Sequence, residues 1–80
     1  MNLRAVMRKL QTALSVKGRH IRINQFQKYS ERADRMVTRY VVQETMRCDD
    51  GVTRLITHIE TYGVADVVKK LAEIYGELNT

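Results

Sequence analysis

The chain has 80 residues, 44% of them hydrophobic, with no proline, and its formal net charge is +5. Without Gly-, Ser- or Pro-rich stretches, this length predicts a single domain, residues 1–80. One cysteine, Cys48, excludes an internal disulfide, and no stretch approaches the roughly 18 apolar residues of a membrane span. We therefore expect a cytoplasmic protein that does not enter the membrane.

The charge is unevenly divided along the chain. Residues 1–40 hold ten basic and two acidic side chains, a balance of +8, whereas residues 41–80 hold four basic and seven acidic ones, a balance of −3. The first acidic residue is Glu31. Such a field attracts polyanions or acidic protein surfaces, but it does not specify a reaction.

A change of period separates the first two predicted elements. Apolar residues recur every 3.6 positions over residues 3–14, which predicts a helix that Asn2 caps and Gly18 ends. Beyond Gly18 the apolar residues alternate, which predicts a first strand up to Tyr29 with a break near Gln25.

Phe26 and the polar segment after it leave alternatives open. Phe26 is out of phase with Ile21 and Ile23, so either a bulge intervenes or Phe26 packs from the opposite face. Residues 30–35 predict a turn, with a short helix opened by Ser30 as the alternative.

Residues 36–48 and 52–61 are rich in β-branched and aromatic side chains and predict a hairpin about Asp50-Gly51. A two-residue type I′ turn gives one largely apolar face, with the pairs Cys48–Thr53, Met46–Leu55, Glu44–Thr57 and Val42–Ile59. A three-residue loop would instead set Met46 against Arg54 and Val42 against His58. Because that register mixes apolar with charged side chains, we predict the two-residue turn.

A second amphipathic helix follows, with an apolar stripe over residues 64–78 and Asp66 in its first turn. The predicted fold class is α+β: a helix, a three-stranded antiparallel sheet and a helix (αβββα), with both helices on one face of the sheet. The covered face is expected to hold Ile21, Ile23, Val42, Met46, Leu55 and Ile59.

Two groups of basic residues are candidate binding sites. The first belongs to the N-terminal helix and the turn and strand after it: Arg4, Arg8, Lys9, Lys17, Arg19 and Arg22. The second is the uncovered sheet face, where the predicted register places Arg39, Arg47 and Arg54. Arg47 is expected directly opposite Arg54, so that an anion would relieve their repulsion unless both side chains diverge into water. Arg22 is expected on the opposite side of the domain from Arg4 and Arg8.

No set of residues predicts catalysis, a metal or a cofactor. His20 and His58 are expected on the uncovered face, where histidines are ordinarily polar surface residues. A magnesium site built from Asp49, Asp50 and Glu60 is disfavoured because turn chemistry explains the two aspartates and Glu60 lies roughly 25–30 Å away. We expect no pair of aromatic residues on the uncovered face, as an RNA-recognition motif would need.

Two resemblances accompany these patterns. The element order in a small basic domain is similar to that of the double-stranded-RNA-binding domain, but Gly63-Val64-Ala65-Asp66 puts an acid where that family has lysines. The runs 27–31 and 35–42, with Glu60-Thr61-Tyr62 and the helix 67–75, resemble short uncharacterised proteins of bacterial prophages and conjugative elements. The second resemblance implies an origin in phage or mobile elements and supplies no activity.

The leading hypothesis is a non-enzymatic accessory protein that binds nucleic acid, largely without base specificity, through the basic N-terminal helix and first strand. The alternative is a protein-interaction module, an adaptor or inhibitor, that docks on an acidic protein surface. A homodimer through an exposed strand edge stays open under both hypotheses. A small hydrolase ranks last.

Overall fold

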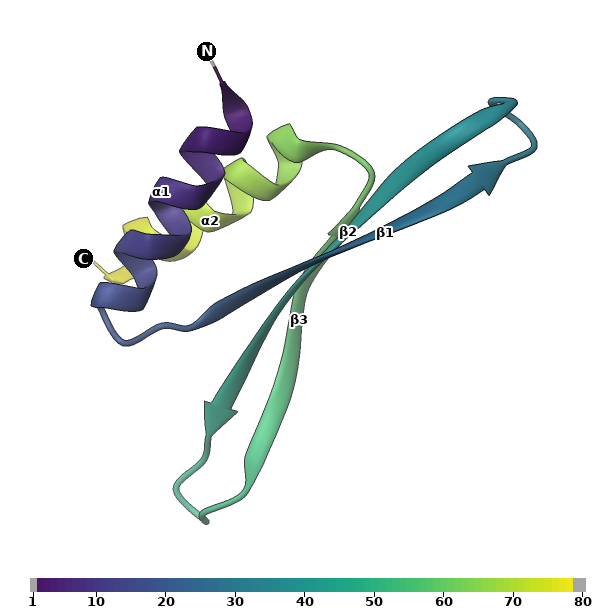
Figure 1. Cartoon of the computed structure of the whole chain (residues 1–80). Helices are drawn as coiled ribbons and strands as arrows, with labels where there is room; N and C mark the ends of the chain where they lie inside the picture. Colours follow the sequence, from purple (N-terminus) through teal and green to yellow (C-terminus); the bar gives the residue numbers. More distant parts are fainter. Residues whose placement is uncertain (1, 79–80) are drawn as a thin grey trace.

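A computed structural model of the chain describes residues 2–78, which form two helices and three strands (Figure 1). The elements are α1 (Leu3–Val16), β1 (Ile21–Ser30), β2 (Arg35–Arg47), β3 (Thr53–Thr61) and α2 (Val64–Leu78). The strands form one antiparallel sheet in the order β1-β2-β3, and both helices lie on the same side of it. The predicted αβββα fold is confirmed.

Both ends of α1 follow the local signals in the sequence. The side-chain oxygen of Asn2 accepts the backbone N–H groups of Arg4 and Ala5, at 3.1 and 3.3 Å, as an N-cap does. At the other end Gly18 has φ +85°, and the N–H of Arg19 returns to the carbonyl of Leu14 at 2.8 Å. Glycine adopts this left-handed conformation without steric cost, so the helix ends where predicted.

The core lies between the two helices and the middle of the sheet. Its buried members are Met7 and Leu14 from α1, Val67, Leu71 and Ile74 from α2, and Ile21, Tyr40 and Val42 from the sheet. Because Ile21 and Val42 share one face by register, that face is the covered one. Neither described helix is long and apolar enough to cross a membrane.

Both hairpins extend beyond the helices as arms that point in different directions (Figure 1). We call residues 25–39 the β1–β2 arm and residues 45–56 the β2–β3 arm. The molecule is correspondingly long and flat, with extents of 46 × 32 × 16 Å. The expected burial of Met46 and Leu55 is therefore wrong: they belong to the second arm and are 39% and 60% exposed.

The turn between β2 and β3 differs from the predicted type I′ turn. The N–H of Gly51 donates to the carbonyl of Cys48 at 2.9 Å, and the N–H of Cys48 to that of Val52 at 2.9 Å, which encloses a three-residue loop. A type I′ turn needs positive φ at both Asp50 and Gly51, but of these two only Gly51 has it, at +81°. The predicted turn was therefore one residue too short.

This longer loop changes the register of the second arm. Met46 pairs with Arg54 and Arg47 with Thr53, so three of the predicted pairs are wrong by one residue. A β-bulge, in which His58 is the extra residue, then shifts the register and restores the predicted pair Val42–Ile59.

The pairing of β1 with β2 runs without interruption from Ile21–Glu44 to Ser30–Arg35. The predicted break near Gln25 is therefore wrong, and Phe26 faces away from Ile21, as the second alternative had it. The turn over residues 31–34 is confirmed; the N–H of Ala33 donates to the Ser30 hydroxyl oxygen at 3.3 Å.

Candidate nucleic-acid interface

The side of the sheet away from the helices, here called the uncovered face, is strongly basic. The register places six charged residues on it: Arg22 and Lys28 on β1, Arg35, Arg39 and Arg47 on β2, and Glu60 on β3. Five bases and one acid give this face a net charge of +4, against +5 for the whole chain. The net charge of this one face is therefore almost as large as the net charge of the whole protein.

The single acid on the uncovered face neutralises one arginine only. Nη2 of Arg39 lies 2.7 Å from Oε2 of Glu60, with both side chains well exposed. The other four bases, Arg22, Lys28, Arg35 and Arg47, form no salt bridge with any carboxylate of residues 2–78. These four cations can contact an anionic ligand without first breaking an ion pair.

Neutral polar groups join the three strands at the centre of this face. Nδ2 of Asn24 donates to Oε1 of Gln43 at 3.0 Å, and Nε2 of Gln43 donates to the hydroxyl of Thr57 at 3.4 Å. Val41, beside them on β2, is buried. These hydrogen bonds hold the side chains of Asn24, Gln43 and Thr57 in place between the two arms. The long basic side chains lie around them.

Two exposed aromatic rings also lie on the uncovered face. Phe26 is opposite Arg39 and is 53% exposed, and Tyr62 follows β3 and is 61% exposed. Tyr62 lines an open hollow of about 360 Å³ together with Lys28, Ser30, Arg32 and Val37. The expectation that this face carries no pair of aromatic residues is wrong, because the unbroken β1 turns Phe26 towards it.

The predicted basic residues of α1 form a separate surface. Arg4 and Arg8, one turn apart, line a hollow of about 420 Å³ with Asn2 and Ala5. Lys9 follows Arg8 directly, so it is rotated by about 100° around the helix axis and faces another direction. The structure therefore brings Arg4 and Arg8 together, and not Lys9.

Arg22 lies closer to α1 than predicted. It lines a hollow of about 310 Å³ with Gln11, Thr12, Ser15 and His20, between the flank of α1 and the start of β1. Because β1 is an edge strand, Arg22 reaches this flank from the uncovered face. Arg22 therefore belongs to the uncovered face, away from Arg4 and Arg8, as expected, although it also borders the flank of α1.

The other three sequence-predicted basic residues are Lys17, Arg19 and Arg54. Lys17 is the C-cap residue of α1 and is exposed, whereas Arg19 is held in an ion pair described below. Arg54 pairs with Met46, so it lies on the face opposite to Arg47, and the predicted repulsion between them is wrong. The one-residue error in the turn is the cause.

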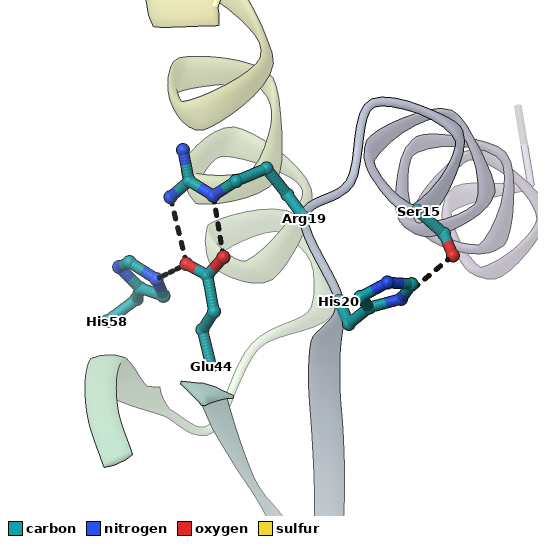
Figure 2. Close-up of polar contacts among 5 residues, drawn as sticks. All are labelled: Ser15, Arg19, His20, Glu44 and His58. Carbon is teal, nitrogen blue, oxygen red and sulfur yellow. Dashed lines mark hydrogen bonds and ion pairs between the residues drawn. The ribbon is translucent and has the colours of Figure 1, made fainter. Parts of the chain in front are cut away.

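Glu44 is the one buried charged residue among residues 2–78 and lies on the covered face of β2. Only 2% of the residue is exposed. Arg19 contacts both of its oxygens, Nε to Oε2 at 2.6 Å and Nη2 to Oε1 at 2.8 Å, and Nε2 of His58 lies 2.9 Å from Oε1 (Figure 2). Because an ionised carboxylate only accepts hydrogen bonds, Nε2 of His58 carries a proton in this contact. His58 therefore points to the covered side, not to the uncovered face as predicted.

The electrostatics of this cluster suit a structural clamp. The Arg19 hydrogen bonds lower the pKa of the Glu44 carboxyl from its ordinary value, against the opposing effect of burial, and His58 lowers it further. Bonding to Glu44 in turn raises the pKa of the Arg19 guanidinium. An ionised, fully bonded carboxylate fixes the loop after α1 and the bulge at His58 to the middle of β2.

His20, the other histidine, is apart from this cluster. Its Nδ1 lies 3.2 Å from the Ser15 hydroxyl, on the α1 side of Figure 2. Among residues 2–78, no three His, Cys, Asp or Glu side chains are grouped as ligands of a metal ion would be.

The chain was compared with protein-family models, curated proteins and solved structures, and none of these matches it.

The Glu44 cluster was missed although the sequence held a signal for it. Glu44 has the same parity as Tyr40 and Val42, so the predicted register already placed it on the apolar face. A buried carboxylate needs a cationic or hydrogen-bonding partner, and Arg19 and His58 are residues that can supply one. Because the bulge at His58 was not predicted, the expected alternation placed His58 on the uncovered face, away from Glu44.

Proposed function

We propose that the protein is a non-enzymatic accessory protein that binds nucleic acid through the uncovered face of its sheet, largely without base specificity. The observation that carries the proposal is the charge of that face, where five of six charged side chains are basic. Lys and Arg side chains that neutralise phosphates supply most of the affinity in sequence-independent binding.

The arrangement of these cations supports contact with an extended polyanion. Arg22 lies opposite Gln43 at the centre of the sheet, Lys28 and Arg35 lie on the β1–β2 arm, and Arg47 lies on the β2–β3 arm, so the charges are spread along β1 and β2. The polar groups of Asn24 and Gln43 lie between them and offer amide groups to phosphate or sugar oxygens. Arg4 and Arg8 lie outside this group and serve as its comparison surface.

A salt titration tests the proposal. Fluorescence anisotropy of a labelled oligonucleotide is measured between about 50 and 200 mM salt, where each phosphate contact adds about 0.7–0.9 to the slope of log K against log[salt]. With four or five cations engaged, we expect a slope of about −3 to −4.5. No binding at the lowest salt would contradict the proposal.

A matched pair of double variants separates the sheet from the helix. Arg22→Gln with Arg47→Gln removes two charges from the uncovered face, and we expect the slope to become shallower by about 1.4–1.8. Arg4→Gln with Arg8→Gln removes the same charge from α1 and should leave the slope nearly unchanged. A loss in the helix variant alone would place the interface on α1 instead.

A second candidate function, protein interaction, is favoured by the β2–β3 arm. Met46, Val52, Leu55 and Ile56 are all exposed there, and a two-stranded hairpin is only marginally stable without a covering partner. The arm carries Arg47, Arg54, Asp49 and Asp50, so its local charge is zero and a second copy is not repelled. The outer edge of β3 is unpaired within the sheet, which suits an antiparallel, two-fold pairing of two copies.

Sedimentation analysis of the full chain tests the second candidate. We expect a dimer whose dissociation constant rises in the variant Leu55→Lys. The two-fold pairing would bring the introduced lysine close to the same lysine of the second copy, and the two positive charges would repel each other. Thr12→Lys adds the same charge on an exposed position of α1 and serves as the control. A monomer at all concentrations would contradict self-association through this arm and would leave the proposed nucleic-acid binding unaffected.

A further inference from the structure

The hollow beside Tyr62 combines the groups that recognise a nucleotide. Tyr62 supplies an exposed aromatic ring and Val37 an apolar surface, while Lys28 and Arg32 supply positive charges. The hydroxyl oxygen of Ser30 accepts the Ala33 N–H, which leaves the hydroxyl proton available to donate to an oxygen of a ligand. The volume of about 360 Å³ lies at the lower end of the range for small-molecule sites, roughly 300–1,000 Å³.

A second ring extends this site along the sheet. Phe26 is two residues from Lys28 on β1, so that their Cα atoms are roughly 6.6 Å apart and both side chains face the uncovered side. Arg39 lies directly opposite Phe26 on β2. Aromatic rings interleaved with cations on an open face match the combination used for single strands, in which bases stack on rings while phosphates contact Lys and Arg.

Stacking on exposed rings favours single strands over duplexes on physical grounds. In a duplex each base is already stacked on its neighbours, so its face cannot contact a protein ring unless the helix is opened. An unpaired base has no such cost. We propose that the hollow of Tyr62, with Phe26 beside it, binds unpaired nucleotides and makes the protein selective for single-stranded nucleic acid. This inference rests on the proposed nucleic-acid binding.

The test compares three probes under the same salt conditions: a labelled single strand of about 20 nucleotides, as DNA and as RNA, and a duplex of the same length. We expect both single strands to bind at least about 10-fold more tightly than the duplex. Tyr62→Ala and Phe26→Ala should each weaken single-strand binding by about 5- to 100-fold and leave duplex binding unchanged, whereas Tyr62→Phe should bind as the wild type does.

Tyr29→Ala is the matched control. Tyr29 has the same exposure as Phe26 but pairs with Met36, on the other face of the same arm, so its loss should not change binding. Circular dichroism checks that each variant is folded.

The outcomes separate this inference from the proposed function. Equal affinity for single strand and duplex, with Tyr62→Ala binding like the wild type, overturns the inference and leaves nucleic-acid binding intact. Competition by poly-glutamate as effective per charge as by the single strand also overturns it, because charge alone then explains the affinity. Failure of every nucleic-acid probe to bind at low salt contradicts the proposed function itself.

Discussion

Arg19 donates hydrogen bonds to both carboxylate oxygens of Glu44, from Nε to Oε2 at 2.6 Å and from Nη2 to Oε1 at 2.8 Å. The side chain of Glu44 is 3% exposed and that of Arg19 is 25% exposed, so the pair lies at the margin of the core. It joins the loop after α1 to a strand 25 residues further along the chain. The position of the first helix on the sheet depends on this contact as well as on apolar packing.

Removal of Arg19 is expected to destabilise the fold strongly. Arg19→Met leaves the buried Glu44 carboxylate with His58 as its remaining partner, and we expect a loss of about 3 kcal/mol in the free energy of unfolding. Arg8→Met, on the exposed face of α1, should change it by less than about 0.5 kcal/mol. Urea denaturation measures both. Equal stability of the two variants would contradict the role of the clamp.

The clamp also predicts a pH dependence. The pKa of Glu44 is lower in the folded than in the unfolded chain, so its ionised form stabilises the fold above about pH 4.5. This contribution is lost as the pH falls through the lowered, folded-state pKa. The difference in unfolding free energy between the wild type and Glu44→Gln should therefore be largest near neutral pH and shrink on acidification. A difference that stays constant down to pH 3 would show that the carboxylate charge is not involved.

The same substitution is expected to have very different effects on stability at a leucine of the core and at a leucine of an arm. Leu71→Ala, in the core, should cost about 2–5 kcal/mol because it removes fully buried methyl groups. Leu55→Ala, on the β2–β3 arm, should cost less than about 0.5 kcal/mol at concentrations where the protein is monomeric. Thermal or urea unfolding distinguishes them. A large cost for Leu55→Ala in the monomer would mean that the arm is covered.

Two glycines give a similar test of the turn. Gly51→Ala places a side chain at φ +81°, and we expect a loss of about 1–2 kcal/mol, although nothing lies within 4 Å of the new methyl group. Gly76→Ala also meets open space, but within α2, where alanine is favoured by about 1 kcal/mol. The two variants should therefore shift the melting temperature in opposite directions. A shift in the same direction would contradict the turn geometry.

Periodicity was sufficient to predict the helices and the element order. The signals for the helices are local: the apolar stripes of α1 and α2, Asn2 at the N-terminal cap of α1 and Gly18 at its C-terminal end. Such signals do not depend on how distant parts of the chain pair. The extent of the sheet was also accessible from lengths. Thirteen residues of β2 span about 43 Å, whereas fourteen residues of α1 span about 21 Å, so the helices cannot cover the strands.

The errors came from single residues that the alternating pattern does not distinguish. Gly51 suits either loop length, and the choice of the shorter loop moved Arg54 to the wrong face. His58 forms a bulge that restores the parity of Ile59, so apolar alternation on both sides of it is normal. The predicted register therefore gave a plausible apolar face while misplacing the charged residues that define the candidate site.

The proposed contact of nucleic acid with the uncovered face of the sheet is tested most directly by the side-chain Nε–Hε NMR signals of the arginines. On titration with an oligonucleotide at low salt, we expect the signals of Arg22, Arg35, Arg39 and Arg47 to shift, and those of Arg4, Arg8 and Arg54 to stay in place. Shifts confined to Arg4 and Arg8, or shifts spread equally over these seven arginines, would contradict binding at the uncovered face.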